Sequence, residues 1–269
     1  MQERDRADKI LVARGFAESR EKAQALIMSG QVWSGELRIA KAGHSLLVDA
    51  PLEVRGQLHP YASRGGLKLE KALQQFAIDP SGMTCLDIGA STGGFTSCLL
   101  LAGAAKVYAV DVGYGQLAWD LRNDERVVNI ERQNFRYLEP GDMASAIDLA
   151  VSDVSFISQR HILARLPEFL HETSKVIALI KPQFEAGRDK VGKNGVVRDP
   201  AVHYEVIQRL CSEGYAAGML MLDLGWSPIK GPKGNIEFIS VWCLRSGEES
   251  KFSTGAMLRI VEEAHQSLD

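Results

Sequence analysis

The pattern of apolar and polar residues along the chain is of two kinds. From residue 66 onward these two patterns follow each other in turn and predict strands alternating with helices. Short apolar runs rich in β-branched residues predict buried strands, and apolar residues three or four apart predict helices. The predicted strands cover residues 84–89, 106–113, 126–130, 147–157 and 176–180, and the predicted helices lie near 67–76, 92–101, 117–122, 159–170 and 201–211. This alternation indicates an α/β fold with a mainly parallel, doubly wound sheet. Two last strands, 218–224 and 237–244, have no helix between them and predict a terminal antiparallel hairpin.

A smaller module precedes this domain. Residues 7–14 have helical spacing and stop before Gly15, and Ser19 is placed to cap a second helix that ends at Gly30. Short alternating segments between residues 32 and 48 predict a little β-structure. We therefore predict a small α+β domain over 1–57, a linker over 58–65, the α/β domain over 66–247 and a C-terminal helix over 248–269.

Composition narrows the class of protein. No run of 18 apolar residues could span a membrane, and the charged start "MQERDRADK" is not a signal peptide. Four scattered cysteines without a C-x-x-C pair argue against a disulfide framework or a zinc site, so we expect a cytoplasmic protein without a bound metal. The net charge of −3 excludes a generally basic nucleic-acid binder, so any RNA-binding surface has to be local.

The strand ends carry the first chemical signal, because ligands of such sheets bind beyond the carboxyl ends of the strands. The first strand ends in "LDIGASTGGF", whose Gly89, Gly93 and Gly94 either form a tight turn or let the backbone approach a cofactor. Asp111 ends the second strand, 22 residues after Gly89, where an acid can hold ribose hydroxyls. The two features predict a nucleoside site without separating NAD from S-adenosylmethionine (SAM), and the G-x-x-x-G-G spacing favours a ligand without phosphates.

Four further charged residues stand where strands and helices could bring them together. Asp153 follows "LAVS", Lys181 follows "VIALI", Glu237 begins the last strand and Lys68 lies in the helix before the first one. Each has an ordinary explanation, since a helical lysine usually faces solvent and a strand-end aspartate often caps a helix. Lys181 is the least ordinary, because it ends a buried strand and Pro182 then stops the ladder.

At this point the sequence resembles a known family. The segments "SRGGLKLEKAL", "CLDIGASTGGFT", "DVGYGQLAWDLRND", "DLAVSDVSFIS", "LIKPQFEAGRDKVGKNGVVRDP" and "GPKGNIEF" closely resemble the TlyA family, often called hemolysin A. The resemblance implies a Rossmann-like SAM-dependent methyltransferase domain similar to the FtsJ-type RNA methyltransferases. It also implies 2'-O-methylation of cytidine in ribosomal RNA of the ribosomal subunits, with no membrane and no obligate protein partner. The segment "RADKILVARGFAESREKAQALIMSGQV" resembles the S-four-type RNA-binding domain.

The resemblance also implies roles for individual residues. A catalytic tetrad falls on Lys68, Asp153, Lys181 and Glu237. Cofactor contacts fall on Asp87, Gly89, Ser91, Gly93, Gly94, Phe95, Asp111, Asn134 and Asp153. Phosphate contacts are predicted at Arg4, Arg6, Arg14, Arg20 and Lys22 in the first domain, and at Arg188, Lys190, Lys193, Lys230 and Lys233 in two loops beside the tetrad, although each of these loop lysines could equally be a solvated surface group.

Lys181 is predicted to be the general base that removes the proton of a ribose 2'-hydroxyl. Lysine can do so only if its pKa falls from about 10.4 toward roughly 7–8. Desolvation and the charge of Lys68 would lower this pKa, whereas Asp153 and Glu237 would raise it. Three rival classes remain at this stage: a pore-forming haemolytic protein, which would need an amphipathic or apolar membrane element; a non-catalytic RNA-binding factor, which would not bind SAM; and an NAD enzyme.

Overall fold

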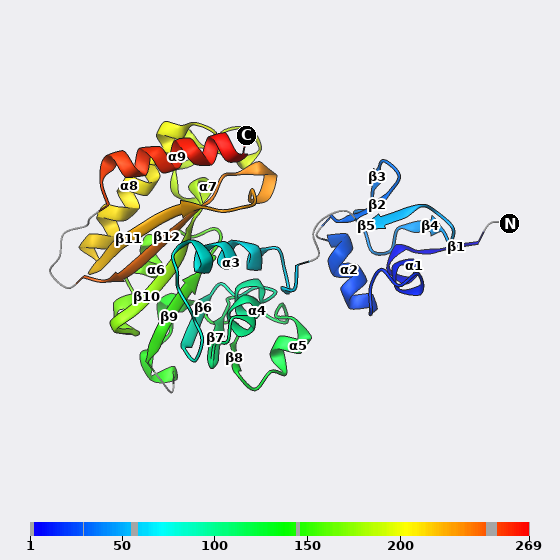
Figure 1. The fold of residues 1–269 in the computed structure, drawn as a ribbon, viewed down its shortest axis with the longest axis horizontal. Helices are drawn as coiled ribbons and strands as arrows, with labels where there is room; N and C mark the ends of the chain where they lie inside the picture. The colour runs from blue at the N-terminus through cyan, green and yellow to red at the C-terminus, as the bar shows by residue number, and fades with distance from the viewer. Residues whose placement is uncertain (1–2, 29, 55–58, 144–145, 246–251, 269) are drawn as a thin grey trace. The chain divides into compact units, whose positions relative to one another are not determined.

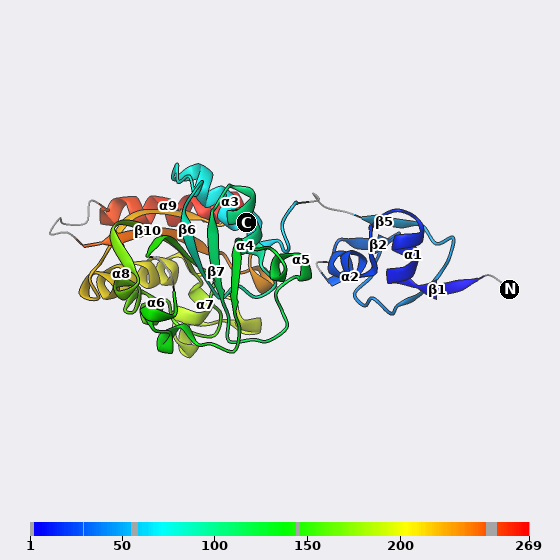
Figure 2. The ribbon, with the colours of Figure 1, turned by 90° about the horizontal axis from the view of Figure 1, so that it is seen from below.

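The structure is a computed structural model that describes residues 3–28, 30–54, 59–143, 146–245 and 252–268. The chain divides into two compact units, Met1–Arg64 and Gly65–Asp269, each with its own hydrophobic core. The predicted linker, 58–65, spans the junction between them. Each unit is described separately below and is drawn in Figures 1 and 2.

The N-terminal unit packs two helices on short strands. Its elements are β1 (Arg4–Arg6), α1 (Ala7–Ala13), α2 (Arg20–Met28), β2 (Val32–Ser34), β3 (Leu37–Arg38), β4 (Ser45–Leu47) and β5 (Leu52–Val54). β1 pairs with β4, and the second sheet has the order β3-β2-β5. The predicted cap is confirmed, since the backbone N–H of Lys22 donates to Ser19 Oγ at 3.2 Å. Ile10, Leu11, Ile27 and Val32 are nearly or fully buried and form the centre of the core.

The second unit contains a seven-stranded sheet of order β11-β12-β10-β9-β6-β7-β8. Its strands are β6 (Thr84–Ile88), β7 (Lys106–Val110), β8 (Val127–Ile130), β9 (Ile147–Ser152), β10 (Leu170–Ile180), β11 (Met219–Trp226) and β12 (Phe238–Leu244). The first five of these are parallel, whereas β12 is antiparallel to both β10 and β11. The predicted terminal hairpin is therefore confirmed, and its second strand lies inside the sheet between β10 and β11.

Helices cover both faces of this sheet (Figures 1 and 2). They are α3 (Gly65–Gln75), α4 (Gly94–Leu101), α5 (Trp119–Arg122), α6 (Arg160–Leu163), α7 (Pro182–Glu185), α8 (Pro200–Ala216) and α9 (Thr254–Leu268), and short 3-10 turns occur at η1 (Phe135–Tyr137), η2 (Pro140–Asp142), η3 (Leu166–Glu168), η4 (Arg188–Lys190), η5 (Lys193–Gly195) and η6 (Pro232–Gly234). Side chains of successive strand residues point to opposite faces. Leu86 and Ile88 thus join the core cluster that also contains residues of α6, α8 and α9, while Asp87 faces Thr96 of α4.

One predicted element is wrong in extent. Residues 159–170 were expected to form a single helix, but α6 ends at Leu163 and Leu170 is already paired with Ile147 in β10. Pro167 explains the break, because its ring and missing N–H prevent the helix from continuing. The predicted C-terminal helix, 248–269, corresponds to α9 but starts later, at Thr254, because Phe252 and Ser253 are not helical; residues 248–251 and 269 lie outside the described residues. Within the described part of the chain, no helix is long and apolar enough to cross a membrane.

Candidate active site

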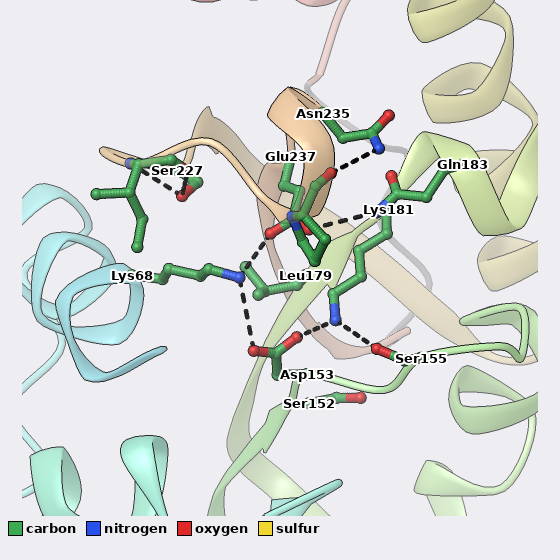
Figure 3. A network of polar contacts seen from close by, with 12 residues as sticks. Lys68, Ser152, Asp153, Ser155, Leu179, Lys181, Gln183, Ser227, Asn235 and Glu237 are labelled. Carbon is green, nitrogen blue, oxygen red and sulfur yellow. Dashed lines mark hydrogen bonds and ion pairs between the residues drawn. The ribbon is translucent and has the colours of Figure 1, made fainter. Parts of the chain in front are cut away.

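The four charged residues singled out in the sequence meet at one edge of the sheet, as Figure 3 shows. Asp153 and Lys181 directly follow the parallel strands β9 and β10. Glu237 directly precedes β12, and because β12 is antiparallel its first residue, Phe238, pairs with Ile180 at the end of β10. The amino end of β12 therefore lies beside the carboxyl ends of its parallel neighbours. Lys68 reaches the same place from α3.

The four side chains form a nearly buried charge quartet. Lys68 Nζ lies 2.6 Å from Glu237 Oε2 and 3.7 Å from Asp153 Oδ2, and Lys181 Nζ lies 2.5 Å from Asp153 Oδ1. Only 9% of each lysine side chain, 19% of Asp153 and none of Glu237 is exposed. Two ammonium groups and two carboxylates sum to zero charge, so each buried ion has a partner of opposite sign.

The two lysines have different surroundings. Burial favours the neutral form of Lys68, but the Asp153 and Glu237 carboxylates outweigh burial, so the pKa of Lys68 is raised above the ordinary lysine value. Lys181 faces one carboxylate and donates a hydrogen bond to Ser155 Oγ at 3.0 Å. Lys68 is thus the lysine held firmly as an ammonium, and Lys181 is the one with a neutral partner.

Three neighbours of the quartet were not singled out in the sequence. Ser155 bonds to Lys181, Gln183 Nε2 donates to Glu237 Oε1 at 3.5 Å, and Phe156 is 90% exposed with its ring centroid 4.9 Å from that of Phe184. Phe156 also has a left-handed backbone, with φ of 64°, which is unusual for a bulky residue. Their position in the sequence could have indicated them, because all three follow a quartet residue closely: Ser155 and Phe156 lie in "DVSFIS", which begins at Asp153, and Gln183 lies in "KPQ", which begins at Lys181.

Most of the predicted cofactor residues lie at the ends of β6 and β7, whereas Asn134 follows β8 and Asp153 follows β9. Gly89 and Gly93 have φ of 86° and 94°, and Ser91 between them has φ of 49°. The Asp111 carboxylate accepts backbone N–H groups from Ser91 at 2.8 Å and from Gly113 at 2.6 Å. Asp111 therefore fastens the glycine turn to the end of the neighbouring strand.

Gly93 is required for the packing of α5 as well as for the backbone conformation of the turn. A Cβ at this position would lie 2.1 Å from Leu121 Cδ1, so the missing side chain leaves room for α5 against the turn. Gly94 begins α4, and Phe95 is only 3% exposed, so its side chain belongs to the core. Asn134 lies beyond the end of β8 and accepts a hydrogen bond from the backbone N–H of Arg136 at 3.0 Å, capping η1.

The donor set at the turn fits a cationic nucleoside such as SAM. Each Asp111 oxygen uses one acceptor position on a backbone N–H, which leaves a second position for a ribose hydroxyl. Asp87 is fully buried, and its Oδ1 has no hydrogen-bond partner among the described residues. No lysine or arginine occurs between residues 84 and 105, so carboxylates dominate the turn and no side-chain cation there would neutralise a pyrophosphate.

Burial raises the pKa of Asp87 to about 7. A hydrogen bond from Thr96 Oγ1 at 2.6 Å favours the carboxylate and lowers this pKa, but its effect is smaller than that of burial. The negative charges of Asp153 and Asp111 act in the same direction as burial. A cation bound nearby would favour the ionised form of this side chain. Asp87 is thus a supporting group beneath the turn, with its charge state tied to that of the site.

In the N-terminal unit, the predicted phosphate-binding residues hold structural partners. Arg6 and Arg20 both bond to buried Asp8, at 2.9 Å and 3.0 Å, and lower the pKa of that carboxyl group, against the opposing effect of its burial. Arg4 donates to the Ser45 carbonyl at 2.8 Å, Arg14 donates to the carbonyls of Ala50 and Val48, and Lys22 pairs with Glu18. Arg6 and Arg20 remain about half exposed.

In the second unit, the predicted phosphate-binding residues lie on the loops 187–197 and 228–235. Lys190 forms an ion pair with Glu205 at 2.5 Å. Arg188, Lys193 and Lys233 are exposed and form no ion pair with any residue that the structure describes. Lys230 is partly buried. Within the described residues, no group of three or more His, Cys, Asp or Glu side chains could hold a metal ion.

Comparison with known proteins defines the class. The family model of the FtsJ-like methyltransferases matches residues 61–243, and that of the S4 domain matches residues 5–48. The sheet order and the charged edge described above thus form the methyltransferase part of a two-domain protein. The relatives then narrow the class to the TlyA family, to which this chain belongs.

Three relatives cover nearly the whole chain. YqxC of Bacillus subtilis, a candidate rRNA methyltransferase, is 50% identical over 98% of this chain and 95% of its own. The 16S/23S rRNA (cytidine-2'-O)-methyltransferase TlyA of Mycobacterium tuberculosis is 41% identical over 98% of both chains. The solved structure of a candidate hemolysin from Streptococcus thermophilus is 40% identical, covers 99% of this chain and 98% of its own, and superposes with a TM-score of 0.79.

Proposed function

We propose that this protein transfers the methyl group of SAM to the ribose 2'-hydroxyl of cytidine in ribosomal RNA, within 16S or 23S RNA of the ribosomal subunits. The observation that carries the proposal is the buried Lys68–Asp153–Lys181–Glu237 quartet beside the glycine turn. The S4 domain and the names of the relatives support an RNA substrate. Such a substrate places the activity in the cytoplasm, which agrees with the four free cysteines.

In this proposal the Lys181 ammonium group first gives its proton to solvent, and the resulting neutral amine takes the proton of the 2'-hydroxyl as the new oxygen–carbon bond forms. Bound SAM would supply a methyl group already activated by its sulfonium. Lys68 stays an ammonium between Glu237 and Asp153, so it can orient the hydroxyl oxygen and cannot accept the proton itself. Asp153 bridges both lysines and holds Lys181 toward the cofactor side of the edge. Asp111 and the glycine turn would hold the cofactor, and Asp87 would support the turn from beneath.

Phe156 supplies a surface for the base of the target nucleotide. A 2'-hydroxyl within folded RNA has to be presented to a buried quartet, which favours a nucleotide turned out of its stack. An exposed aromatic ring next to Ser155, packed on Phe184, is suited to stack on such a base. The positive φ at Phe156 fits this role, because backbone strain tends to persist where a ligand is held.

The test is Lys181→Ala, compared with Lys181→Arg and with Lys175→Ala, which is a control for the loss of an exposed lysine from β10. Transfer from tritiated SAM to separated small and large subunits should fall about 10²- to 10⁴-fold in Lys181→Ala, the usual contribution of a general base. SAM affinity, measured by calorimetry, should change little. Activity within tenfold of wild type in Lys181→Ala contradicts the assignment, and the labelled subunit identifies the substrate.

A further inference from the structure

Two turns beside the quartet have the same backbone structure, although nothing in the proposed chemistry requires it. They are "GKNGV", residues 192–196, and "GPKGN", residues 231–235, here called the twin turns. In both, the first glycine is extended, with φ and ψ of −73° and −174° at Gly192 and of −69° and −174° at Gly231. The third residue is left-handed in both, with φ and ψ of 66° and 11° at Asn194 and of 60° and 12° at Lys233.

The hydrogen bonds of the twin turns also correspond. The first glycine donates its N–H to the carbonyl of the fifth residue, at 3.0 Å in Gly192 to Val196 and at 2.8 Å in Gly231 to Asn235. The fourth residue, a glycine in both, donates to the carbonyl of the first at 3.1 Å. The central residues of both turns are exposed. Two non-glycine residues in the left-handed region cost on the order of 1 kcal/mol each or more, a strain that is typical of ligand-holding sites.

The side-chain amide of Asn235 links the twin turns to each other by hydrogen bonds. Its Nδ2 donates to the Gly195 carbonyl at 3.0 Å and to the Pro232 carbonyl at 3.1 Å, and its Oδ1 accepts the N–H of Val197 at 3.0 Å. Asn235 is 2% exposed, so these bonds are shielded from water. One residue therefore fixes the spacing of two loops that are about 40 residues apart in the sequence, and Figure 3 shows it above Glu237 and Gln183.

The second twin turn also rests directly on the quartet. A Cβ added to Gly231 would lie 2.1 Å from Glu237 Oε1, although the φ of −69° is open to any residue. Gly231 is therefore a glycine for reasons of space, because its bare Cα lets the turn approach the carboxylate. A displacement of the turn would move the Glu237 carboxylate and, through their ion pair, Lys68.

The exposed tips of the twin turns carry positive charge. Lys193 and Lys233 are exposed, and Lys233 Nζ would lie 4.0 Å from a Cβ on Gly195, so it stands over the neighbouring turn. Asp189 is the carboxylate of the same loop region, and Lys190 is already paired with Glu205. Short G-x-x-G turns hold the nucleotide backbone in KH domains, where close approach to phosphates needs residues without side chains.

We propose that the twin turns are a clamp for the RNA sugar–phosphate backbone around the target nucleotide, with Lys193 and Lys233 contacting one phosphate each and Asn235 as the positioning residue. This rests on the proposed RNA substrate and adds how that substrate is held. Phosphate contacts of this kind fix register and do not read sequence. The clamp thus places the ribose at the quartet, while target choice depends on other contacts.

The test is the affinity for purified, unmethylated ribosomal subunits between 50 and 200 mM salt, measured by filter binding. Each lost phosphate contact lowers the slope of log K against log salt by about 0.7–0.9. Lys193→Ala and Lys233→Ala should each show this change, so that the loss of affinity across the salt range becomes about threefold smaller per contact. Lys175→Ala, which removes an exposed lysine from β10, should keep the wild-type slope.

Asn235→Ala tests whether Asn235 positions the two turns for RNA binding, because this substitution removes no charge. It should lower the salt slope as the two lysine variants do and raise the KM for subunits, while calorimetric SAM affinity, which reports an intact fold, stays within about threefold of wild type. Wild-type slopes in Lys193→Ala and Lys233→Ala overturn the clamp, whatever Asn235→Ala does. Methyl transfer by the wild type is measured alongside: if it is absent while the lysine variants still lose slope, the clamp stands and the proposed function fails.

Discussion

The Lys68–Glu237 pair offers the sharpest quantitative test of the quartet, through the free energy of unfolding. Lys68 Nζ and Glu237 Oε2 are 2.6 Å apart, with 9% and 0% of their side chains exposed. Coulomb's law with an effective dielectric constant of 20 gives a gross attraction of about 6 kcal/mol at this distance, most of which offsets the loss of hydration. Removing one partner of a buried pair typically costs about 3–5 kcal/mol, because the other charge stays buried.

The perturbation is a double-mutant cycle of Lys68→Met and Glu237→Leu. Each single variant should lose about 3 kcal/mol, the lower end of that range, since Asp153 still faces Lys68 at 3.7 Å and Gln183 still donates to Glu237. The double variant should be close to wild type in stability, because similar apolar residues replace both ions. The coupling energy, which is the difference between the double variant and the sum of the two single losses, should therefore be about 6 kcal/mol.

The assay is urea unfolding of the full chain, followed by tryptophan fluorescence at pH 7. Trp119, Trp226 and Trp242 all belong to the 65–269 unit, so the signal reports mainly that unit. Because the folded pKa of Lys68 is raised, the contribution of the pair is fully present below the ordinary lysine value and is lost only as pH rises through the folded pKa. Neutral pH therefore lies well within the pH range in which the pair contributes fully to stability.

Lys190 and Glu205 provide a matched control in the same unit. Their atoms are 2.5 Å apart, but 37% and 51% of the side chains are exposed, so water screens the pair. The corresponding cycle should give about 0.2–1 kcal/mol. A coupling energy for Lys68 and Glu237 no larger than that of this exposed pair would refute the reasoning that burial sets the energetics of the quartet.

Two further predictions concern Asp87 and Phe156. Because burial raises the pKa of Asp87 to about 7, the folded protein keeps a proton that the unfolded chain loses near pH 3.8, so stability falls as pH rises between these values, in total by on the order of 4 kcal/mol. Asp87→Asn should remove this slope from a series of thermal melts between pH 4 and 8, and parallel curves for variant and wild type would contradict it. Phe156→Ala should raise the KM for ribosomal subunits about 5- to 150-fold, a stacking contribution of about 1–3 kcal/mol, while Phe156→Tyr restores it. An equal effect of Tyr215→Ala, which removes a half-exposed ring from α8, would show that Phe156 has no special role.

The local pattern of the sequence was sufficient for most of the elements. Apolar runs of four to six residues predicted the parallel strands, and Ser19 predicted a helix cap that the structure confirms. The same pattern failed over residues 159–170, where Pro167 and the long strand β10 override helical spacing. Residues that follow parallel strands necessarily share an edge, so Asp111, Asp153 and Lys181 could be grouped from their positions alone.

Tertiary structure alone decided how those groups are used. Glu237 reaches the edge because β12 inserts antiparallel between β10 and β11, a pairing that hydrophobic spacing does not encode. Arg20 turns toward Asp8 on the preceding helix, and Asn235 joins two loops about 40 residues apart, so both depend on contacts between separate elements. The sequence by itself determined which charges stand at strand ends, because that depends on local periodicity. The distances of 2.5 to 3.7 Å that make them one buried quartet depend on sheet order and helix packing, which are non-local.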